Sequence, residues 1–303
     1  VCILQDKSRF RQFLKDNNFN VPNAKGYSSI EEALADTAYY NWPVIVKPVD
    51  SAGSKGVTRV DELGQLSSAI DYALSESHNG HFIIEDFLEK EGNSSDCDSF
   101  TVDGELVFCS FNDQHFDPKA INPYTPAAFS WPSTMPQWAQ EELRSELQRL
   151  ITLLNVKKGV YNIETRLCKN GKPYIMELAP RGGGNRLSEM MKYISGQDLI
   201  DNCVRAAVGD SIDEIHQPDY DGYWAEIILH SERDGVFQSI EIDKTVEERF
   251  LIEKDIWVKT GDKVHGFTGA NTTIGTLVLR FNTNEEMTCC LSNQETWFKI
   301  IVL

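Results

Sequence analysis

Apolar and polar positions recur along the chain at two spacings, which predict helices and strands in alternation. Phe10, Phe13 and Leu14 share one face of a predicted helix that begins near Asp6 and ends at about residue 18. Further helices are predicted over residues 28–40, 62–76, 137–154, 187–208 and 283–291. Strands are predicted at 44–47 and 82–86, in a hairpin over 96–111, and over most of the chain after residue 212. The pattern indicates an α+β protein with mostly antiparallel sheets.

The segment GVYNIETRLCKNGKPYIMELAPRGGGNR, residues 159–186, carries the sharpest pattern. Two apolar runs flank Asn170-Gly171, a dipeptide typical of a two-residue hairpin turn. Counting outward from this turn pairs Lys169 with Lys172, Glu164 with Glu177, and Asn162 with Ala179. Side chains alternate faces along a strand, so one face of the hairpin belongs to a core. The other face is predicted to carry Asn162, Glu164, Arg166 and Glu177.

The opposed glutamates need a partner. Directly opposed side chains have Cβ atoms roughly 4.5–5.5 Å apart, and like charges there destabilise a sheet. Three arrangements would resolve the repulsion: a cation bridges Glu164 and Glu177, one of them is protonated, or Arg166 and a second base neutralise them. A solvated hairpin face without function is the plainest alternative.

Composition excludes several classes of function. The 303 residues have a formal net charge of −17, which argues against nucleic acid as a partner. No apolar run approaches the roughly 20 residues needed to span a bilayer, so no membrane partner is expected. The 7 cysteines show neither paired spacing nor a C-x-x-C motif, a usage typical of reduced thiols in a cytoplasmic protein.

Residues typical of a nucleotide–magnesium site surround the hairpin in the sequence. Lys47 ends the apolar run at 44–46, where an ammonium group can meet a phosphate. The glycine-rich loop DSAGSKGV follows at once and allows close approach of a ligand to the backbone. Arg181 follows Glu177 by four residues, and three glycines then lead into a predicted helix start, which suits anions. Mg²⁺ prefers a few carboxylates together with substrate phosphates.

In type and order these motifs resemble the ATP-grasp superfamily of carboxylate–amine ligases. The resemblance covers residues 5–210 and rests on DK (6–7), VIVKP (44–48), DSAGSKGV (50–57), IIEDFLEKEG (83–92), YNIE (161–164) and IMELAPR (175–181). The tail at 221–303 resembles the C-terminal lobe of carbamoyl-phosphate-synthase-like members. The implied fold has two α+β lobes that clasp ATP and a smaller C-terminal β-rich lobe. The expected boundaries are 1–211 for the ATP-grasp domain, with a lid at about 41–111, and 212–303 for the C-terminal lobe.

The resemblance also implies a role for each matching residue. Lys7 and Lys47 would contact ATP phosphates, and Glu85 would accept a hydrogen bond from the adenine amino group. Phe87 and Leu88 would form the apolar and backbone hinge. The glycine loop residues expected to bind the nucleotide are Ser51, Gly53, Ser54 and Gly56. Glu164 and Glu177 would hold one or two Mg²⁺ (or Mn²⁺) ions, and Arg181 would steady the transferring phosphoryl group.

The chain departs from the family pattern at three points. E-x-N-x-R becomes Glu177-Leu178-Ala179-Pro180-Arg181, which lacks a common metal ligand. Asn162 faces Ala179 in the counted register and is the expected substitute, with Asn185 as the second candidate. Glu91, Asp96 and Asp98 give no clean match to the family's ribose-binding acid. The family also carries a separate domain before the DK helix, and contacts from such a domain are expected to be absent here.

The implied reaction is ATP-dependent ligation. A substrate carboxylate attacks the γ-phosphate, and an amine (or thiol) displaces phosphate from the acylphosphate, with release of ADP. Small-molecule acids and amines are then the partners, and a homo-oligomer is compatible with the sequence. A nucleotide-binding protein without ligase activity is the main alternative. A hydrolase that uses the two glutamates as acid and base is a third, but it leaves Lys47 and the glycine loop unexplained.

Overall fold

The computed structural model describes residues 2–303, and it forms two compact units built from interleaved segments of the chain. The first unit comprises the described residues up to Ser94 together with Met135–Val156 and Tyr161–Arg181. The second comprises Ser95–Thr134, Lys157–Val160 and Gly182–Leu303. Because the segments interleave, the predicted linear boundary after residue 211 stays a prediction. The predicted ATP-grasp domain begins at residue 1, which lies outside the described residues.

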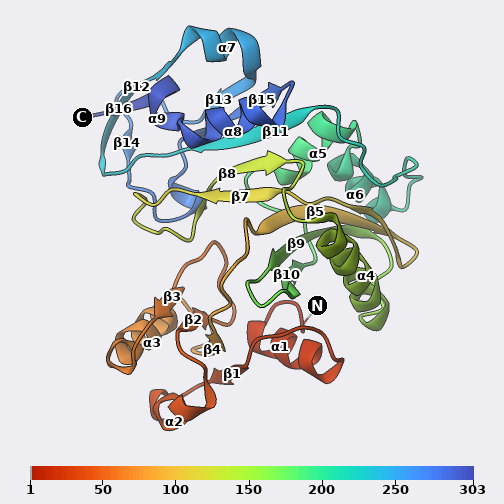
Figure 1. The fold of residues 1–303 in the computed structure, drawn as a ribbon, viewed down its shortest axis with the longest axis vertical. Helices are drawn as coiled ribbons and strands as arrows, with labels where there is room; N and C mark the ends of the chain where they lie inside the picture. The colour runs from red at the N-terminus through yellow and green to blue at the C-terminus, as the bar shows by residue number, and fades with distance from the viewer. Residues whose placement is uncertain (1) are drawn as a thin grey trace. The chain divides into compact units, whose positions relative to one another are not determined.

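The first unit begins with a small antiparallel sheet that two helices cover (Figure 1). Its strand order is β1-β4-β2-β3. The elements are α1 (Lys7–Asp16), β1 (Ala24–Tyr27), α2 (Ile30–Ala35), β2 (Val44–Pro48), β3 (Thr58–Val60), α3 (Leu66–Ser75) and β4 (Phe82–Asp86). Val44 and Val46 of β2 pack with Leu66 and Ile70 of α3 in one buried cluster. The intervening residue and the one after, Ile45 and Lys47, therefore face the other side of the sheet.

The same unit contains the glutamate hairpin and the long predicted helix. The hairpin consists of β9 (Gly159–Leu167) and β10 (Pro173–Ala179), which pair antiparallel. The helix is α4 (Gln137–Leu153), which contacts β10. Its buried side chains repeat at helical spacing through Leu143, Leu147 and Leu150, as the sequence pattern predicts.

The second unit contains a five-stranded antiparallel sheet of order β13-β15-β11-β8-β7 and a three-stranded sheet of order β14-β12-β16. Its strands are β5 (Ser95–Val102), β6 (Glu105–Cys109), β7 (Asp113–Phe116), β8 (Pro126–Trp131), β11 (Tyr223–Leu229), β12 (Gly235–Ile242), β13 (Leu251–Ile256), β14 (Lys263–Val264), β15 (Gly275–Phe281) and β16 (Phe298–Val302). Its helices are α5 (Leu187–Ser195), α6 (Leu199–Val208), α7 (Lys244–Phe250), α8 (Asn284–Ser292) and α9 (Gln294–Trp297). The single helix predicted over 187–208 is two helices, because Gly196 adopts a left-handed φ of 73° and caps α5.

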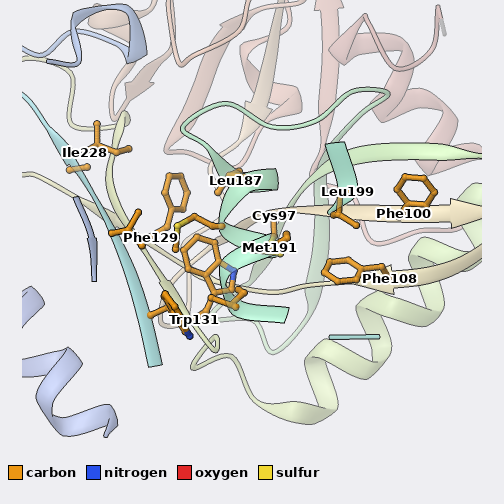
Figure 2. Packing of buried hydrophobic residues seen from close by; sticks show 14 of the residues in the cluster. Cys97, Phe100, Phe108, Phe129, Trp131, Leu187, Met191, Leu199 and Ile228 are labelled. Carbon is orange, nitrogen blue, oxygen red and sulfur yellow. The ribbon is translucent and has the colours of Figure 1, made fainter. Parts of the chain in front are cut away.

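Two apolar clusters cover opposite faces of the five-stranded sheet. Figure 2 shows the larger one, in which Phe129 and Trp131 of β8 lie with Leu187 and Met191 of α5. The other contains alternate residues of β11 and the buried side of α8. No helix within residues 2–303 is long and apolar enough to cross a membrane. The observed architecture is α+β with antiparallel sheets, as predicted.

Candidate nucleotide and metal site

Lys47 and Glu85 meet on the face of the first sheet that α3 leaves uncovered. Strands β2 and β4 are neighbours, and the Lys47 Nζ donates a hydrogen bond of 2.9 Å to Glu85 Oε2. Arg11 of α1 reaches the same carboxylate, with its Nε 2.9 Å from Oε1. That Nε makes no well-directed hydrogen bond, so the contact is an ion pair. Glu85 and Arg11 are 1% and 4% exposed, which makes this a buried three-charge cluster.

The charges in this cluster shift the pKa values in a consistent way. Burial alone would raise the pKa of Glu85, but Arg11 and Lys47 outweigh burial and hold that pKa at about 2. Glu85 is therefore ionised at neutral pH. Burial lowers the pKa of Lys47, and Arg11 lowers it further, whereas Glu85 and Glu164 act in the opposite direction.

The turn of the glutamate hairpin differs from the predicted two-residue turn. The Cys168 N–H bonds the Lys172 carbonyl at 3.0 Å, and the Gly171 N–H bonds the Cys168 carbonyl at 2.8 Å. Three residues therefore form the loop, and Lys169 does not face Lys172. Gly171 takes a left-handed φ of 76°, which lets the loop close with one residue more than predicted.

A second irregularity restores the predicted register at the glutamates. The pairing shifts by one residue between Ile175 and Glu177, so a β-bulge offsets the longer turn. Beyond the bulge, Glu164 lies directly opposite Glu177 and Asn162 directly opposite Ala179. The predicted pairing is confirmed, although the path to it contains two compensating changes.

Each glutamate has its own cation in the first unit. Arg166 Nη2 lies 3.7 Å from Glu164 Oε1, and Lys7 Nζ lies 3.7 Å from Glu177 Oε2. The carboxylates are 33% and 35% exposed, so solvent and ligands reach both. Of the three arrangements that would relieve the repulsion between the two glutamates, the structure shows the one in which two basic side chains, Arg166 and Lys7, neutralise them. Both contacts are longer than a hydrogen bond, which leaves the carboxylate oxygens able to bind a metal ion.

The donor set fits a magnesium ion shared with a nucleotide. Within residues 2–303 no group of three or more His, Cys, Asp or Glu side chains could hold a metal ion. Two carboxylates with an amide beside them match the preference of Mg²⁺ for few protein ligands plus phosphate oxygens. Asn162 precedes Glu164 by two positions on β9 and so shares its face. The Asn162 backbone N–H donates to the Arg181 carbonyl at 2.7 Å, which ties β9 to the last residue of the IMELAPR motif.

The glycine loop follows β2. Lys7 contacts this loop, because its Nζ donates a hydrogen bond of 2.8 Å to the Ser51 carbonyl. Three of its residues adopt left-handed backbone conformations: Gly53, Ser54 and Gly56 have φ of 69°, 58° and 70°. A side chain at Gly56 would stand 3.0 Å from Pro48, so glycine is required there by both conformation and space.

The predicted hinge begins directly after β4. The Phe87 N–H donates to the Pro43 carbonyl at 2.9 Å, and the Arg59 guanidinium stands 4.5 Å above the Phe87 ring. The Leu88 carbonyl accepts a hydrogen bond of 3.2 Å from Arg166. The Leu88 side chain packs on an apolar cluster of the hairpin, which consists of Cys168, Tyr174 and Met176. The structure therefore brings the hinge and the hairpin together.

Of the three acidic candidates for ribose, Asp98 is already bound within the protein. It is completely buried and accepts hydrogen bonds from the Gly183 N–H at 2.8 Å and from the Ser188 hydroxyl. Asp98 thus anchors the glycine run before α5, a task that the sequence pattern did not indicate. Asn185, the second metal-ligand candidate, lies in this second unit.

Comparison with known families decides the relationship. Residues 40–189 match the family model of the ATP-grasp domain. The protein contains an ATP-grasp domain. The match spans the predicted lid, hinge and both metal carboxylates, and it confirms the predicted family.

Solved structures agree with this fold along almost the whole chain. The L-amino acid ligase from Bacillus licheniformis has a TM-score of 0.81 at 19% identity and covers 99% of this chain and 73% of its own. The N5-carboxyaminoimidazole ribonucleotide synthetase from Thermotoga maritima has a TM-score of 0.72 at 16% identity and covers 99% and 73%. The biotin carboxylase domain dimer of Hydrogenobacter thermophilus 2-oxoglutarate carboxylase, solved with MgADP and bicarbonate, has a TM-score of 0.74 at 17% identity and covers 99% and 67%.

The predicted fold class is therefore confirmed, and the ATP-grasp match supports ATP as the cofactor. One solved structure of this fold contains MgADP. Family membership supports an ATP-dependent, ADP-forming ligase. At these identities the solved structures show the fold alone. The roles of individual residues and the substrates are taken up as proposals.

Arg11 is the site residue that the sequence analysis missed. It follows Lys7 by four positions on α1, so helical spacing places both on one side of the helix and could have indicated it. A cavity of about 340 Å³ lies beside α1 and β1; Arg11 lines it, whereas none of the site residues predicted from the sequence does.

Proposed function

We propose that this protein is an ATP-dependent ligase that activates a small-molecule carboxylate as an acylphosphate and joins it to an amine (or thiol). One observation carries the proposal. Glu164 and Glu177 face each other across β9 and β10, each beside a cation and each accessible, in a unit that also holds Lys47. Such a pair fits a metal ion that arrives with the phosphates of a nucleotide.

The proposed metal ligands are Glu164, Glu177 and Asn162. Bound there, Mg²⁺ (or Mn²⁺) would neutralise charge on the phosphates of ATP. Arg166 and Lys7 lie beyond hydrogen-bond distance of the glutamates, so they balance the carboxylates before the metal binds without occupying its place. Lys7 and Lys47 are proposed to bind phosphate oxygens, and Arg181 to contact the transferring phosphoryl group.

Phosphoryl transfer of this kind depends on position and charge more than on a protein nucleophile. We propose that the loop with Ser51, Gly53, Ser54 and Gly56 closes over the phosphates. Closure would exclude water, which would otherwise hydrolyse the acylphosphate before the amine attacks. The contact from Lys7 to the Ser51 carbonyl already links this loop to a proposed phosphate ligand.

The proposed adenine site joins β4 to the hairpin cluster. Glu85 would accept a hydrogen bond from the adenine amino group at Oε1, which accepts no hydrogen bond within the described residues. Phe87 and Leu88 would line the base, with the apolar cluster of Cys168, Tyr174 and Met176 beneath Leu88. In this proposal the ATP-grasp domain covers residues 1–211, and residues 212–303 form an additional C-terminal lobe.

The substrate class follows from the kind of enzyme that shares the fold. An L-amino acid ligase and an N5-carboxyaminoimidazole ribonucleotide synthetase both act on small molecules, as their names state. The net charge of −17 disfavours nucleic acid as a substrate. We therefore propose small carboxylic acids and amines as the substrates.

The test is ADP release by purified protein with pairs of amino acids and simple amines, monitored by a coupled assay. Glu177→Gln should abolish ADP formation and leave the melting temperature close to that of the wild type. Glu241→Gln, at an exposed glutamate on β12, is the matched control and should retain full activity. Normal ADP formation by Glu177→Gln would refute the metal assignment.

One observation favours a second function. Ala179 stands where the family pattern has asparagine, and loss of a metal ligand would suit a nucleotide-binding protein without ligase activity. That function predicts Mg²⁺-dependent binding of ATP with no ADP release for any pair of acid and amine. Nucleotide binding measured beside the activity screen separates the two functions.

A further inference from the structure

Helix α1 presents two cations to the proposed nucleotide site, four residues apart and on the same side. Lys7 contacts Glu177 and the glycine loop. Arg11, one turn later, donates from Nη1 to the Met176 carbonyl at 2.8 Å and from Nη2 to Glu85 Oε2 at 3.5 Å. Arg11 thereby ties α1 to both β4 and β10, yet the proposed function gives it no task.

The cluster of Arg11, Glu85 and Lys47 contains one more positive charge than negative charge. Two cations share one carboxylate, and the side chains are only 4%, 1% and 13% exposed. With Arg11 these three side chains have a net charge of +1, and Glu164 is the further carboxylate that acts on Lys47. Burial of an uncompensated charge is costly unless an anion approaches it. Lys47 is the most exposed of the three, so an anion can reach the cluster at the Lys47 ammonium group.

Lys47 has two competing partners in this arrangement. The Lys47 Nζ bonds Glu85 at 2.9 Å, and the proposed function requires the same ammonium group for phosphate. If Lys47 turned away from a Glu85 that had no other cation, a buried carboxylate would remain unpaired. That loss would oppose nucleotide binding.

We infer that Arg11 is a positioning residue that keeps Glu85 neutralised while Lys47 moves from Glu85 to the phosphates of ATP. The inference rests on the proposed function, because it requires nucleotide at this site. Arg11 need not touch the nucleotide. It holds Glu85 through Nε at 2.9 Å, so the carboxylate keeps a partner after Lys47 leaves.

A purely structural tie makes a different prediction. If Arg11 only fastened α1 to the Met176 carbonyl, its loss would weaken the fold regardless of the charge at position 85. If Arg11 instead neutralises Glu85, loss of Arg11 should weaken binding only while position 85 carries a charge. A double-mutant cycle on these two positions separates the explanations.

The experiment measures the dissociation constant of a non-hydrolysable ATP analogue with Mg²⁺ by calorimetry, together with melting temperatures. Arg11→Met should weaken binding about tenfold or more, as expected when a charged partner is lost at a buried site. Glu85→Gln removes the charge but also alters a proposed adenine contact, so it serves as the reference for the double variant. Adding Arg11→Met to Glu85→Gln should change the dissociation constant by less than about threefold, since Lys47 then leaves no charge behind.

Two further variants control for folding and for loss of charge elsewhere. Arg9→Met removes an exposed arginine of α1 that pairs with the helix cap Asp6, and it should bind like the wild type. Arg11→Lys keeps a cation beside Glu85 and should recover most of the affinity lost in Arg11→Met, which supports the inference even if Arg11→Met folds poorly.

Three outcomes would overturn the inference. Arg11→Met could bind like the wild type, Arg11→Met could weaken binding as much in the Glu85→Gln background as it does alone, or Arg11→Lys could be as defective as Arg11→Met. A wild type that fails to bind the analogue would overturn the proposed function and this inference together. That result is recognisable, because neither the wild type nor any variant would then bind the analogue.

Discussion

Glu226 is a buried carboxyl group that has no hydrogen-bond partner among residues 2–303. It is completely buried on β11, directly opposite Phe129 of β8 and Val278 of β15. Neither side-chain oxygen has a hydrogen-bond partner within the described residues. Burial raises the pKa of Glu226 well above its ordinary value, an effect that Arg186 opposes and Glu189 reinforces. The second unit therefore favours the protonated form.

Glu226→Met should stabilise the protein. Methionine keeps a long unbranched side chain and removes both polar atoms from an apolar cluster. An unpaired buried polar group costs about 1–3 kcal/mol, and we expect a gain of that size. With an unfolding entropy of about 2.1 cal/mol/K per residue, the 303 residues convert 1–3 kcal/mol into a rise in melting temperature of roughly 2–5 °C.

The gain should depend on pH with a definite sign. Unfolded Glu226 has an ordinary pKa of 4.5, and the folded pKa is raised. The stability that accompanies protonated Glu226 is fully present below the unfolded pKa and is lost as the pH rises through the folded pKa. The free energy of unfolding of the wild type should therefore decrease relative to that of Glu226→Met as the pH increases. Urea denaturation at a series of pH values from 5 to about 9 measures this gap.

Two controls sharpen the result. Glu226→Gln should remove the pH dependence but gain less stability, because its amide is also left unpaired. Glu241→Met, at an exposed glutamate of the same unit, should change stability by less than about 0.5 kcal/mol. A gap that stays constant with pH, or a less stable Glu226→Met at pH 8, would refute the reasoning.

Three further predictions concern the site and its supports. Asn162→Ala should weaken Mg²⁺-dependent nucleotide binding, and adding Ala179→Asn should restore it because the two positions are directly opposed; no rescue would count against Asn162 as a ligand. Gly56→Ala should destabilise the protein more than Gly53→Ala in thermal melts. Both substitutions cost about 1–2 kcal/mol because alanine must adopt a left-handed conformation, but of the two positions only Gly56 also lacks space for a side chain. Equal losses of stability would contradict the loop geometry. Asp98→Asn should cost about 1.5–3 kcal/mol in urea denaturation by weakening two hydrogen bonds to a charged acceptor, and an unchanged midpoint would show that its charge is not needed.

Local pattern predicted the elements that hold the proposed ligands. The run at 44–46 gave β2 and so the position of Lys47, and the alternation in the hairpin gave the face shared by Glu164 and Glu177. The register was right although the turn was wrong, because a bulge near Met176 compensates for the longer loop. Counting from a turn cannot detect two changes that cancel.

Long-range contacts account for what the sequence did not predict. Arg11 meets Met176 across 165 positions of the chain, and Asp98 meets Ser188 across 90. Neither pairing leaves a periodic signal, since each joins elements that approach only in the folded protein. Glu226 was missed for a related reason: a single acidic residue in an apolar strand gives no sign of whether the fold supplies a partner.

The most direct test of the central claim is calorimetric titration with a non-hydrolysable ATP analogue, with and without Mg²⁺, for the wild type, Glu164→Gln and Glu177→Gln. The account predicts that Mg²⁺ strengthens binding to the wild type at least about tenfold and that either substitution removes most of this gain. Binding without metal should persist in both variants, since Lys47 and Glu85 are intact. An equal gain from Mg²⁺ in all three proteins would contradict the claim that the opposed glutamates hold the metal.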